Sequence, residues 1–258
     1  MIARLALPQV TLISVASLDI DKSHAALLHC ARHIDFGAIK MVCSSLPAST
    51  TLSVEYLPIP ELDYLGYQRF MIESLNGYIQ TDYCLVVQAD GFILDPARWN
   101  DRFLDYDYIG APWAEVVAVG DSETSLLLNL DKNRVGNGGF SLRSKKLLEA
   151  TSLVSFDTLN FAKIEDLLIC HYLYDDLKAS GLRFATPEVA ALFSIEDTRG
   201  LYGQSITSVF GFHGKHWLPE VFRRRRADLK VHLGSIRRNQ ICPCGAGLKY
   251  KHCCGILK

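Results

Sequence analysis

The chain has 258 residues, enough for one large domain or for a domain with a small additional module, and 49% of them are hydrophobic, so it can form a substantial core. The net charge of −1 indicates no special partner, and no apolar run approaches the ~20 residues that cross a bilayer, which argues against a transmembrane segment. The charge is uneven: ten of the 27 Lys and Arg residues, but only one of the 28 Asp and Glu residues, lie in residues 221–258. This pattern indicates a basic tail with its own protein or nucleic-acid partner, or a solvated basic helix docked on the acidic body.

The first residues, MIARLALPQVTLISVASL, are not typical of a signal peptide. They contain a single early Arg, a Pro interrupts the apolar stretch, and no small-residue cleavage site is evident. We therefore expect a cytoplasmic protein.

Strands and helices alternate in the first half of the sequence. The hydrophobic pattern predicts a helix over Asp19–Ile34 and a second helix that follows a cap at Asp63. It predicts strands over Gln9–Val15, Ala38–Cys43, Leu52–Tyr56 and Tyr83–Gln88. This order predicts an α/β fold with a mostly parallel sheet flanked by helices.

Asp90 follows directly after the last of these strands. Ligands of open α/β sheets bind at the carboxyl ends of the strands, so Asp90 is expected to project into a crevice there. Gly91 allows a turn and the close approach of a ligand. The alternative is that Asp90 only forms the turn before the glycine.

The second half has a different character. A short strand is predicted over Phe140–Arg143, with a helix from Ser144 and a longer helix over Ile164–Ser180 that Gly181 ends. Strand character returns over Phe184–Ile195, where Pro187 interrupts it, and over Ser208–Phe212. The long polar segment Val117–Arg134 is expected to be a loop that acts as a mobile lid.

The eight cysteines form two groups. Cys30, Cys43, Cys84 and Cys170 lie in apolar surroundings and are expected to be reduced core residues. The other four lie within thirteen residues, with the spacing of a tetrahedral zinc site: Cys242, Cys244, Cys253 and Cys254. A closed site of four thiolates is structural, and Zn²⁺ would supply folding free energy to this small module.

The cysteine-rich stretch CPCGAGLKYKHCC resembles the SEC-C zinc motif. The resemblance implies zinc at the four cysteines and a module that binds proteins or nucleic acid. The expected organisation is therefore a body over residues 1–220, a basic linker or helix over 221–238, and a SEC-C module over 239–258.

The body resembles an uncharacterised bacterial family that is assigned to nucleotide-sugar glycosyltransferases of the GT-A type. The resemblance covers roughly Val10–Trp217 and depends on an ordered set of segments: QADGF, FLDYDYIGAPW, VGNGGFSLRS, IEDLLICHYL, FSIED and FGFHG. It implies a GT-A-like, Rossmann-related fold, a nucleotide-sugar donor, and a glycan or protein acceptor.

The resemblance also implies a divalent cation, Mn²⁺ or Mg²⁺, that neutralises the diphosphate leaving group. The usual strand-end motif of such enzymes is Asp-x-Asp, but here only the second acid, Asp90, is present. Gln88 occupies the first position of the motif, where it could supply an amide oxygen to the cation or contact the sugar. His213 matches in order the His that completes the metal site in several GT-A enzymes; alternatively it is a packed histidine.

Three further segments match elements that face the substrates in GT-A enzymes. The loop Asn137-Gly138-Gly139 with Ser141 would present backbone amides to the donor and the acceptor, although a plain turn also explains Gly-Gly. The pair Glu165-Asp166 would supply the general base, with Asp166 preferred over Glu165, although acids are also favoured in a first helical turn. Trp113 would be a platform for a sugar, or a core residue.

The sequence therefore predicts a glycosyltransferase that moves a sugar from a nucleotide sugar to a hydroxyl. A non-catalytic sugar- or nucleotide-binding module, with a zinc tail that binds a protein, a ribosome or RNA, is the alternative. A metal-dependent phosphohydrolase is less well supported, since one strand-end Asp and a distant His are too few ligands.

Overall fold

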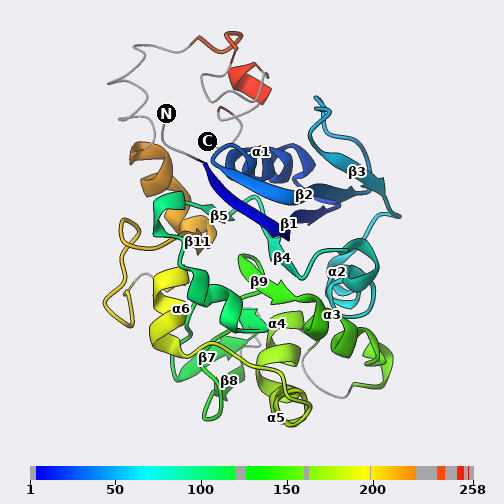
Figure 1. Cartoon of the computed structure of the whole chain (residues 1–258), viewed down its shortest axis with the longest axis vertical. Helices are drawn as coiled ribbons and strands as arrows, with labels where there is room; N and C mark the ends of the chain where they lie inside the picture. Colours follow the sequence, from blue (N-terminus) through cyan, green and yellow to red (C-terminus); the bar gives the residue numbers. More distant parts are fainter. Residues whose placement is uncertain are drawn as a thin grey trace.

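A computed structural model describes most of the body and short parts of the tail (Figure 1). The described residues are 4–119, 126–159, 163–197, 199–224, 237–241, 249–252 and 255. The four cysteines of the expected zinc site lie outside them, and so does most of the basic tail.

The centre of the body is a six-stranded sheet with the order β3-β2-β1-β4-β9-β6. Its strands are β1 (Leu5–Ala16), β2 (Ile34–Cys43), β3 (Glu55–Pro58), β4 (Tyr83–Val86), β6 (Tyr108–Ile109) and β9 (Ser141–Ser144). The first four pair in parallel, and β9 pairs antiparallel with both β4 and β6. The predicted α/β fold with a mostly parallel sheet is confirmed. The parallel strands β1 to β4 come from the first half of the sequence, where strands and helices alternate.

Helices cover the sheet. Helix α1 (Ile20–Ala31) packs on β1 and β2 (Figure 1). The others are α2 (Tyr64–Arg69), α3 (Lys145–Ser152), α4 (Glu165–Leu167), α5 (Tyr174–Ala179) and α6 (Pro187–Phe193). The predicted cap at Asp63 is confirmed, since Gly66 N donates to Asp63 Oδ1 (2.6 Å). Ser144 also caps α3, since Leu147 N donates to Ser144 Oγ (3.0 Å).

The two long predicted helices are not regular. After α2 the chain continues as a π-helical turn, Phe70–Ser74, and a 3₁₀ turn, Leu75–Tyr78. After α4 it continues as a π-helical turn, Leu168–Tyr172, before α5. Such π-turns are frequent at functional sites, and both of these lie next to residues of the site described below.

Several predictions of secondary structure are wrong in detail. The strand predicted over Ser208–Phe212 is confined to Gly211–His213, and the helix predicted over Asp19–Ile34 ends at Ala31. Residues 187–193 form helix α6 instead of a strand, because Pro187 occupies the first turn, where its missing N–H costs nothing. Within the predicted strand, β10 (Ser194–Ile195) is a strand and Phe184 forms an isolated bridge with Tyr108. The expected loop after Trp113 contains a hairpin of β7 (Val116–Val119) and β8 (Leu126–Asn129). The third strand is Glu55–Pro58, a few residues later than predicted.

A small second sheet fixes the candidate site. Its order is β10-β11-β5, where β11 is Gly211–His213 and β5 is Gly91–Ile93. His213 pairs opposite Gly91, and Gly214 N donates to the carbonyl of Asp90 (2.8 Å). Residues separated by more than a hundred positions are thereby placed side by side.

The core is apolar and reduced. Cys30, Cys43, Cys84 and Cys170 are buried and form no disulfide in the described structure, as predicted. In the described part of the chain, no helix has the length and hydrophobicity to cross a membrane.

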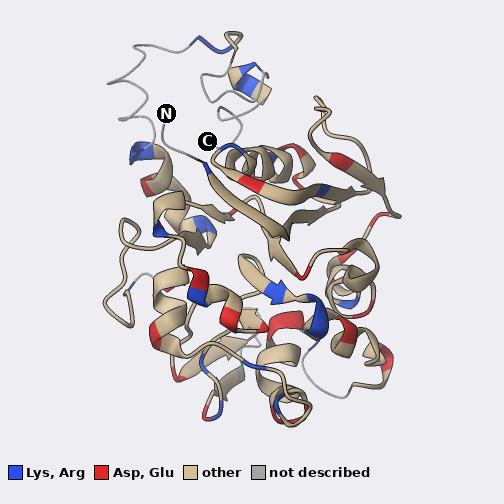
Figure 2. Cartoon of the chain, in the orientation of Figure 1, with Lys and Arg blue, Asp and Glu red and all other residues tan. Residues whose placement is uncertain are grey.

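Acidic residues are spread over the described body (Figure 2). The first two arginines of the basic run, Arg223 and Arg224, pair with Glu220 in the helical segment 218–224.

Candidate functional site

A tight turn at the carboxyl end of β4 carries the first site residues. Gln88 N donates to Gly91 O (2.9 Å) and Gly91 N donates to Gln88 O (3.2 Å), so that Asp90 stands at the tip of the turn. The side chain of Asp90 is 17% exposed. The turn therefore delivers a carboxylate at the strand end, as the sequence predicts.

The His213 imidazole lies at the centre of the site. Its Nε2 is 3.3 Å from Gln88 Oε1 and 3.8 Å from Asp90 Oδ1. The amide of Gln88 is oriented by Tyr67, because Gln88 Nε2 donates to Tyr67 Oη (2.6 Å) and leaves Oε1 facing the imidazole. His213 is thus part of a polar cluster with Asp90 and Gln88.

The other ring nitrogen of His213 has two neighbours of opposite kind. Nδ1 is 3.3 Å from Glu196 Oε1, an acceptor, and 2.8 Å from Asn137 Nδ2, a donor. Burial alone would lower the pKa of His213, but the hydrogen bond and charge of Glu196, with the charges of Asp90 and Asp166, raise it overall above its usual value. The surrounding carboxylates therefore favour positive charge at this position, which a protonated imidazole or a bound cation would supply.

Two glycines make room for this imidazole. A Cβ added at Gly139 would lie 2.1 Å from His213 Nε2, and one at Gly91 would lie 2.7 Å from His213 Cδ2. The sequence predicts the close approach of a ligand at these glycines, whereas the group that approaches both in this structure is His213, and the ligand contacts stay predictions.

The loop Asn137–Gly139 joins the two halves of the site. Asn137 adopts a left-handed conformation (φ 62°), and its Nδ2 donates to Glu196 Oε1 (2.5 Å). Ser141 is fully buried, and its hydroxyl donates to the carbonyl of Gly138 (3.0 Å). The amide of Gly138 donates to Asp166 Oδ2 (2.9 Å). The loop therefore lies between His213 on one side and Asp166 on the other.

Asp166 is half-buried at the start of α4. Its Oδ2 accepts from Gly138 N, and its Oδ1 accepts from Leu167 N (2.8 Å). Burial, followed by the negative charge of Glu165, raises the pKa of Asp166 to about 7, although the backbone hydrogen bonds act in the opposite direction. A carboxylate with this pKa can accept a proton near neutral pH.

Glu165 has a different environment. It is 4% exposed, and its Oε1 accepts from Arg143 Nη2 (3.0 Å), a side chain with no exposed surface. A Cβ at Gly138 would lie 1.6 Å from Glu165 Oε1, so the loop covers this acid closely. The structure separates the two acids: Asp166 reaches a pocket, and Glu165 forms a buried ion pair beneath the loop.

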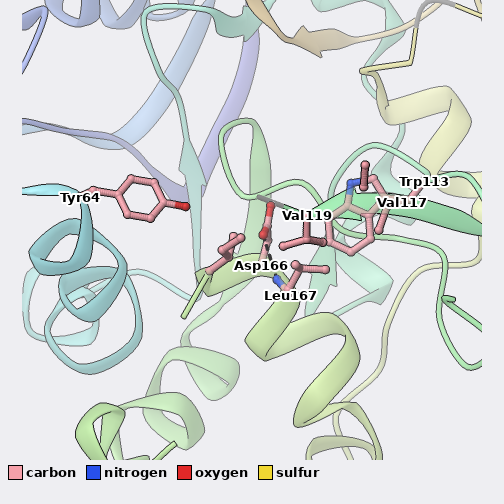
Figure 3. Close-up of a pocket in the computed structure, with 8 residues that line it drawn as sticks. Tyr64, Trp113, Val117, Val119, Asp166 and Leu167 are labelled. Carbon is pink, nitrogen blue, oxygen red and sulfur yellow. Dashed lines mark hydrogen bonds between the residues drawn. The ribbon is translucent and has the colours of Figure 1, made fainter. Parts of the chain in front are cut away.

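A pocket of about 500 Å³ lies beside Asp166 (Figure 3). It is lined by Tyr64, Trp113, Val117, Ala118, Val119, Ile164, Asp166 and Leu167. Trp113 also packs against the core, and a Cβ at Gly136 would lie 2.0 Å from its ring. Core packing of Trp113 is therefore confirmed, the indole also lines the pocket, and its role as a platform for a sugar stays a prediction.

Glu196 is an acid of the site that the sequence does not predict. Its Oε1 accepts from Asn137 and faces His213, and its Oε2 accepts from Trp113 Nε1 (3.1 Å). One carboxylate thus links the cluster around His213 with the wall of the pocket. The available signal was its position directly after the short strand β10, which resembles the position of Asp90 after β4.

Glu196→Gln is expected to lower the pKa of His213 and to destabilise the protein by about 1–3 kcal/mol. The variant keeps the shape, but a single amide oxygen cannot replace two carboxylate oxygens, and its NH₂ would face a donor. NMR titration of the imidazole and urea unfolding would measure the two effects. Glu188→Gln, an exposed acid on α6, is the matched control. An unchanged His213 titration would contradict the inferred contact.

The described residues hold no group of three or more His, Cys, Asp and Glu side chains that could bind a metal. Asp90 and His213 are two side chains of these types that lie close together. The amide oxygen of Gln88 lies near His213 and is a third potential ligand atom. Cys242, Cys244, Cys253 and Cys254 stay predictions.

Comparisons with known proteins identify two segments. A family model described as "Protein of unknown function (DUF5672)" matches residues 53–213. The SEC-C motif matches residues 238–256, as expected. Protein translocase subunit SecA of Dichelobacter nodosus (strain VCS1703A) is 61% identical over 28 residues, which are 11% of this chain and 3% of that protein.

Among solved structures, one similar fold is that of a glycosyltransferase involved in the glycosylation of the major capsid of PBCV-1. The match covers 84% of this chain and 98% of that chain, with a TM-score of 0.45 and 13% identity. A likeness this distant says nothing about the reaction.

Proposed function

Since this chain belongs to the protein family DUF5672, whose description assigns no function, we propose from the site itself that it is a nucleotide-sugar-dependent glycosyltransferase of the GT-A type. One observation carries the proposal. A carboxylate with a pKa of about 7 borders a pocket on one side of the loop Asn137–Gly139, and the Asp90–His213 pair lies on the other side. Sugar transfer needs a base for the acceptor and a charged site for the leaving group, and the loop separates two such places.

Asp166 acts as the general base. The acceptor hydroxyl gives its proton to a carboxylate oxygen of Asp166, and the acceptor oxygen forms a bond to the anomeric carbon of the donor. The bond between that carbon and the diphosphate oxygen breaks, and its electron pair leaves with the nucleoside diphosphate. Both oxygens of Asp166 are held by backbone amides, so the carboxylate is oriented before the acceptor binds.

The polar cluster around His213 faces the diphosphate. The residues fit a divalent cation such as Mn²⁺ or Mg²⁺, since Asp90 Oδ1, Gln88 Oε1 and His213 Nε2 lie close together. Ligation by Nε2 requires the tautomer in which Nδ1–H donates to Glu196, an arrangement that commonly orients metal-binding histidines. A bound cation would neutralise charge on the leaving group.

Binding of nucleoside diphosphates tests the donor side. Calorimetry with uridine and guanosine diphosphates, each with and without Mn²⁺, is expected to show Mn²⁺-dependent binding that Asp90→Asn weakens by roughly tenfold or more. Asp82→Asn, at the opposite end of β4, is the matched control and should bind like the wild type. Equal affinity of the Asp90 and Asp82 variants would remove Asp90 from the donor site.

The presence of Gln88 where GT-A enzymes usually carry an Asp favours a second function. The body would then be a non-catalytic module that binds a sugar or a nucleotide, and the tail would bind a protein, a ribosome or RNA. Diphosphate binding without consumption of any nucleotide sugar would favour this function. In both cases we propose that the four tail cysteines hold a structural Zn²⁺.

A further inference from the structure

The pocket beside Asp166 is mostly apolar. Its described walls are hydrocarbon and aromatic surface from Trp113, Val117, Ala118, Val119, Ile164 and Leu167. Among these described lining residues, the only polar side-chain groups besides the Trp113 indole N–H are the Asp166 carboxylate and the Tyr64 hydroxyl. The indole N–H is already bonded to Glu196. The pocket thus offers very few partners to a ligand with many hydroxyls.

The apolar surface lies on opposing sides. Figure 3 shows Tyr64 on one side of the pocket and Trp113, with Val117 and Val119, on the other, while Asp166 and Leu167 lie between them. A pyranose could place one apolar face on Trp113, but the hydroxyls around its ring would then face hydrocarbon. Each hydroxyl buried without a hydrogen bond costs free energy, so a free sugar fits this pocket poorly.

We propose that this pocket binds the acceptor, and that the acceptor is an alcohol or phenol whose hydroxyl is carried by an aromatic or aliphatic scaffold rather than by a free sugar. The inference rests on the proposed function and narrows its acceptor class. A single hydroxyl directed at Asp166 uses the one charged group among the described lining residues, and the scaffold fills the rest. A volume of about 500 Å³ suits a small molecule of this kind.

Direct binding to the full chain tests the ligand class. The probes are 4-ethylphenol and benzyl alcohol against glucose and galactose, measured by ligand-detected NMR titration. The aromatic alcohols are expected to bind at least ~10-fold more tightly than the hexoses, because only they avoid the loss of hydroxyl hydrogen bonds.

A near-isosteric pair of variants locates the binding. Val117→Thr places a hydroxyl in the pocket wall and is expected to weaken the binding of the aromatic alcohols by about 5-fold or more. Val116→Thr is the matched control, since Val116 is on the same strand but is not part of the pocket lining, and it should leave the affinity unchanged. Thermal unfolding of both variants checks that the two substitutions leave the protein equally stable.

The outcomes separate this inference from the proposed function. Hexoses that bind as tightly as the aromatic alcohols, binding of neither class, or equal effects of the two valine variants would each overturn it. Transfer of a sugar onto 4-ethylphenol from a panel of nucleotide sugars, detected by mass spectrometry, would support both proposals. If no nucleotide sugar binds or is consumed while Val117→Thr still weakens the alcohols selectively, the transferase is overturned and the ligand class of the pocket stands.

Discussion

Asp166→Asn is expected to lower sugar transfer by about 10²–10⁴-fold and to leave nucleoside diphosphate binding nearly unchanged. Asparagine has the size of aspartate but cannot accept the acceptor proton. Donor binding should persist, because Asp90 and His213 lie on the other side of the loop Asn137–Gly139. Steady-state rates with a panel of nucleotide sugars and calorimetry with diphosphates measure the two quantities separately.

The pH dependence of the wild type gives an independent check. Asp166 acts in its deprotonated form, and burial raises its pKa to about 7. Activity should therefore rise with pH through about 7 and fall about tenfold per pH unit well below it. The Asn variant should lack this rising limb.

A surface acid serves as the control for Asp166. Asp157 is exposed and pairs with Arg69, so Asp157→Asn should preserve both the rate and the pH profile. A flat wild-type profile between pH 5 and 8, or full activity of Asp166→Asn, would exclude Asp166 as the base.

The sequence predicts the acidic pair but not the difference between its members. Adjacent acids at the start of a helix look alike in a sequence, and only the surroundings distinguish them. Glu165 meets Arg143, which belongs to β9 and comes 22 residues earlier in the chain, whereas Asp166 meets two backbone amides and a pocket. Contacts between such distant segments leave no local pattern.

The same limit explains what was predicted of the fold. Alternation of apolar segments identifies β1, α1, β2 and β4, because their burial depends on periodicity within each segment. It fails for residues 187–193, where an apolar segment that begins at Pro187 is compatible with a strand or a helix. Glu196 escapes notice for a related reason, since its partners Asn137 and His213 come from distant segments and leave no local pattern around it.

Among the substitutions considered, removal of one partner of the buried Arg143–Glu165 ion pair should have the largest effect on the free energy of unfolding. Arg143→Met is expected to destabilise the protein by about 3–5 kcal/mol, because it leaves Glu165 as an uncompensated charge in the interior. The substitution also removes the hydrogen bonds that Arg143 donates to Ser141 Oγ and to the carbonyl of Gly138. These bonds hold the loop in place. Urea unfolding measures the loss.

A double variant separates the pair from the packing around it. Arg143 Nη1 and Glu165 Oε2 have no hydrogen-bond partner among the described residues, so the pair is incompletely satisfied. Replacing both charges, as in Arg143→Met with Glu165→Gln, should therefore recover much of the stability lost in the single variant. Arg69→Met removes an arginine from an exposed pair with Asp157 and should have a far smaller effect.

The double variant also bears on why the pair is present. If its stability is restored but sugar transfer stays low well above pH 7, where Asp166 is deprotonated with or without the Glu165 charge, the pair serves to hold Gly138 against Asp166 and not primarily to stabilise the fold. That outcome is expected, because Arg143 and Asp166 bind the carbonyl and the amide of the same residue, Gly138. If the single variant is as stable as the wild type, Glu165 is not held as a buried charge, and the distinction between the two acids is wrong.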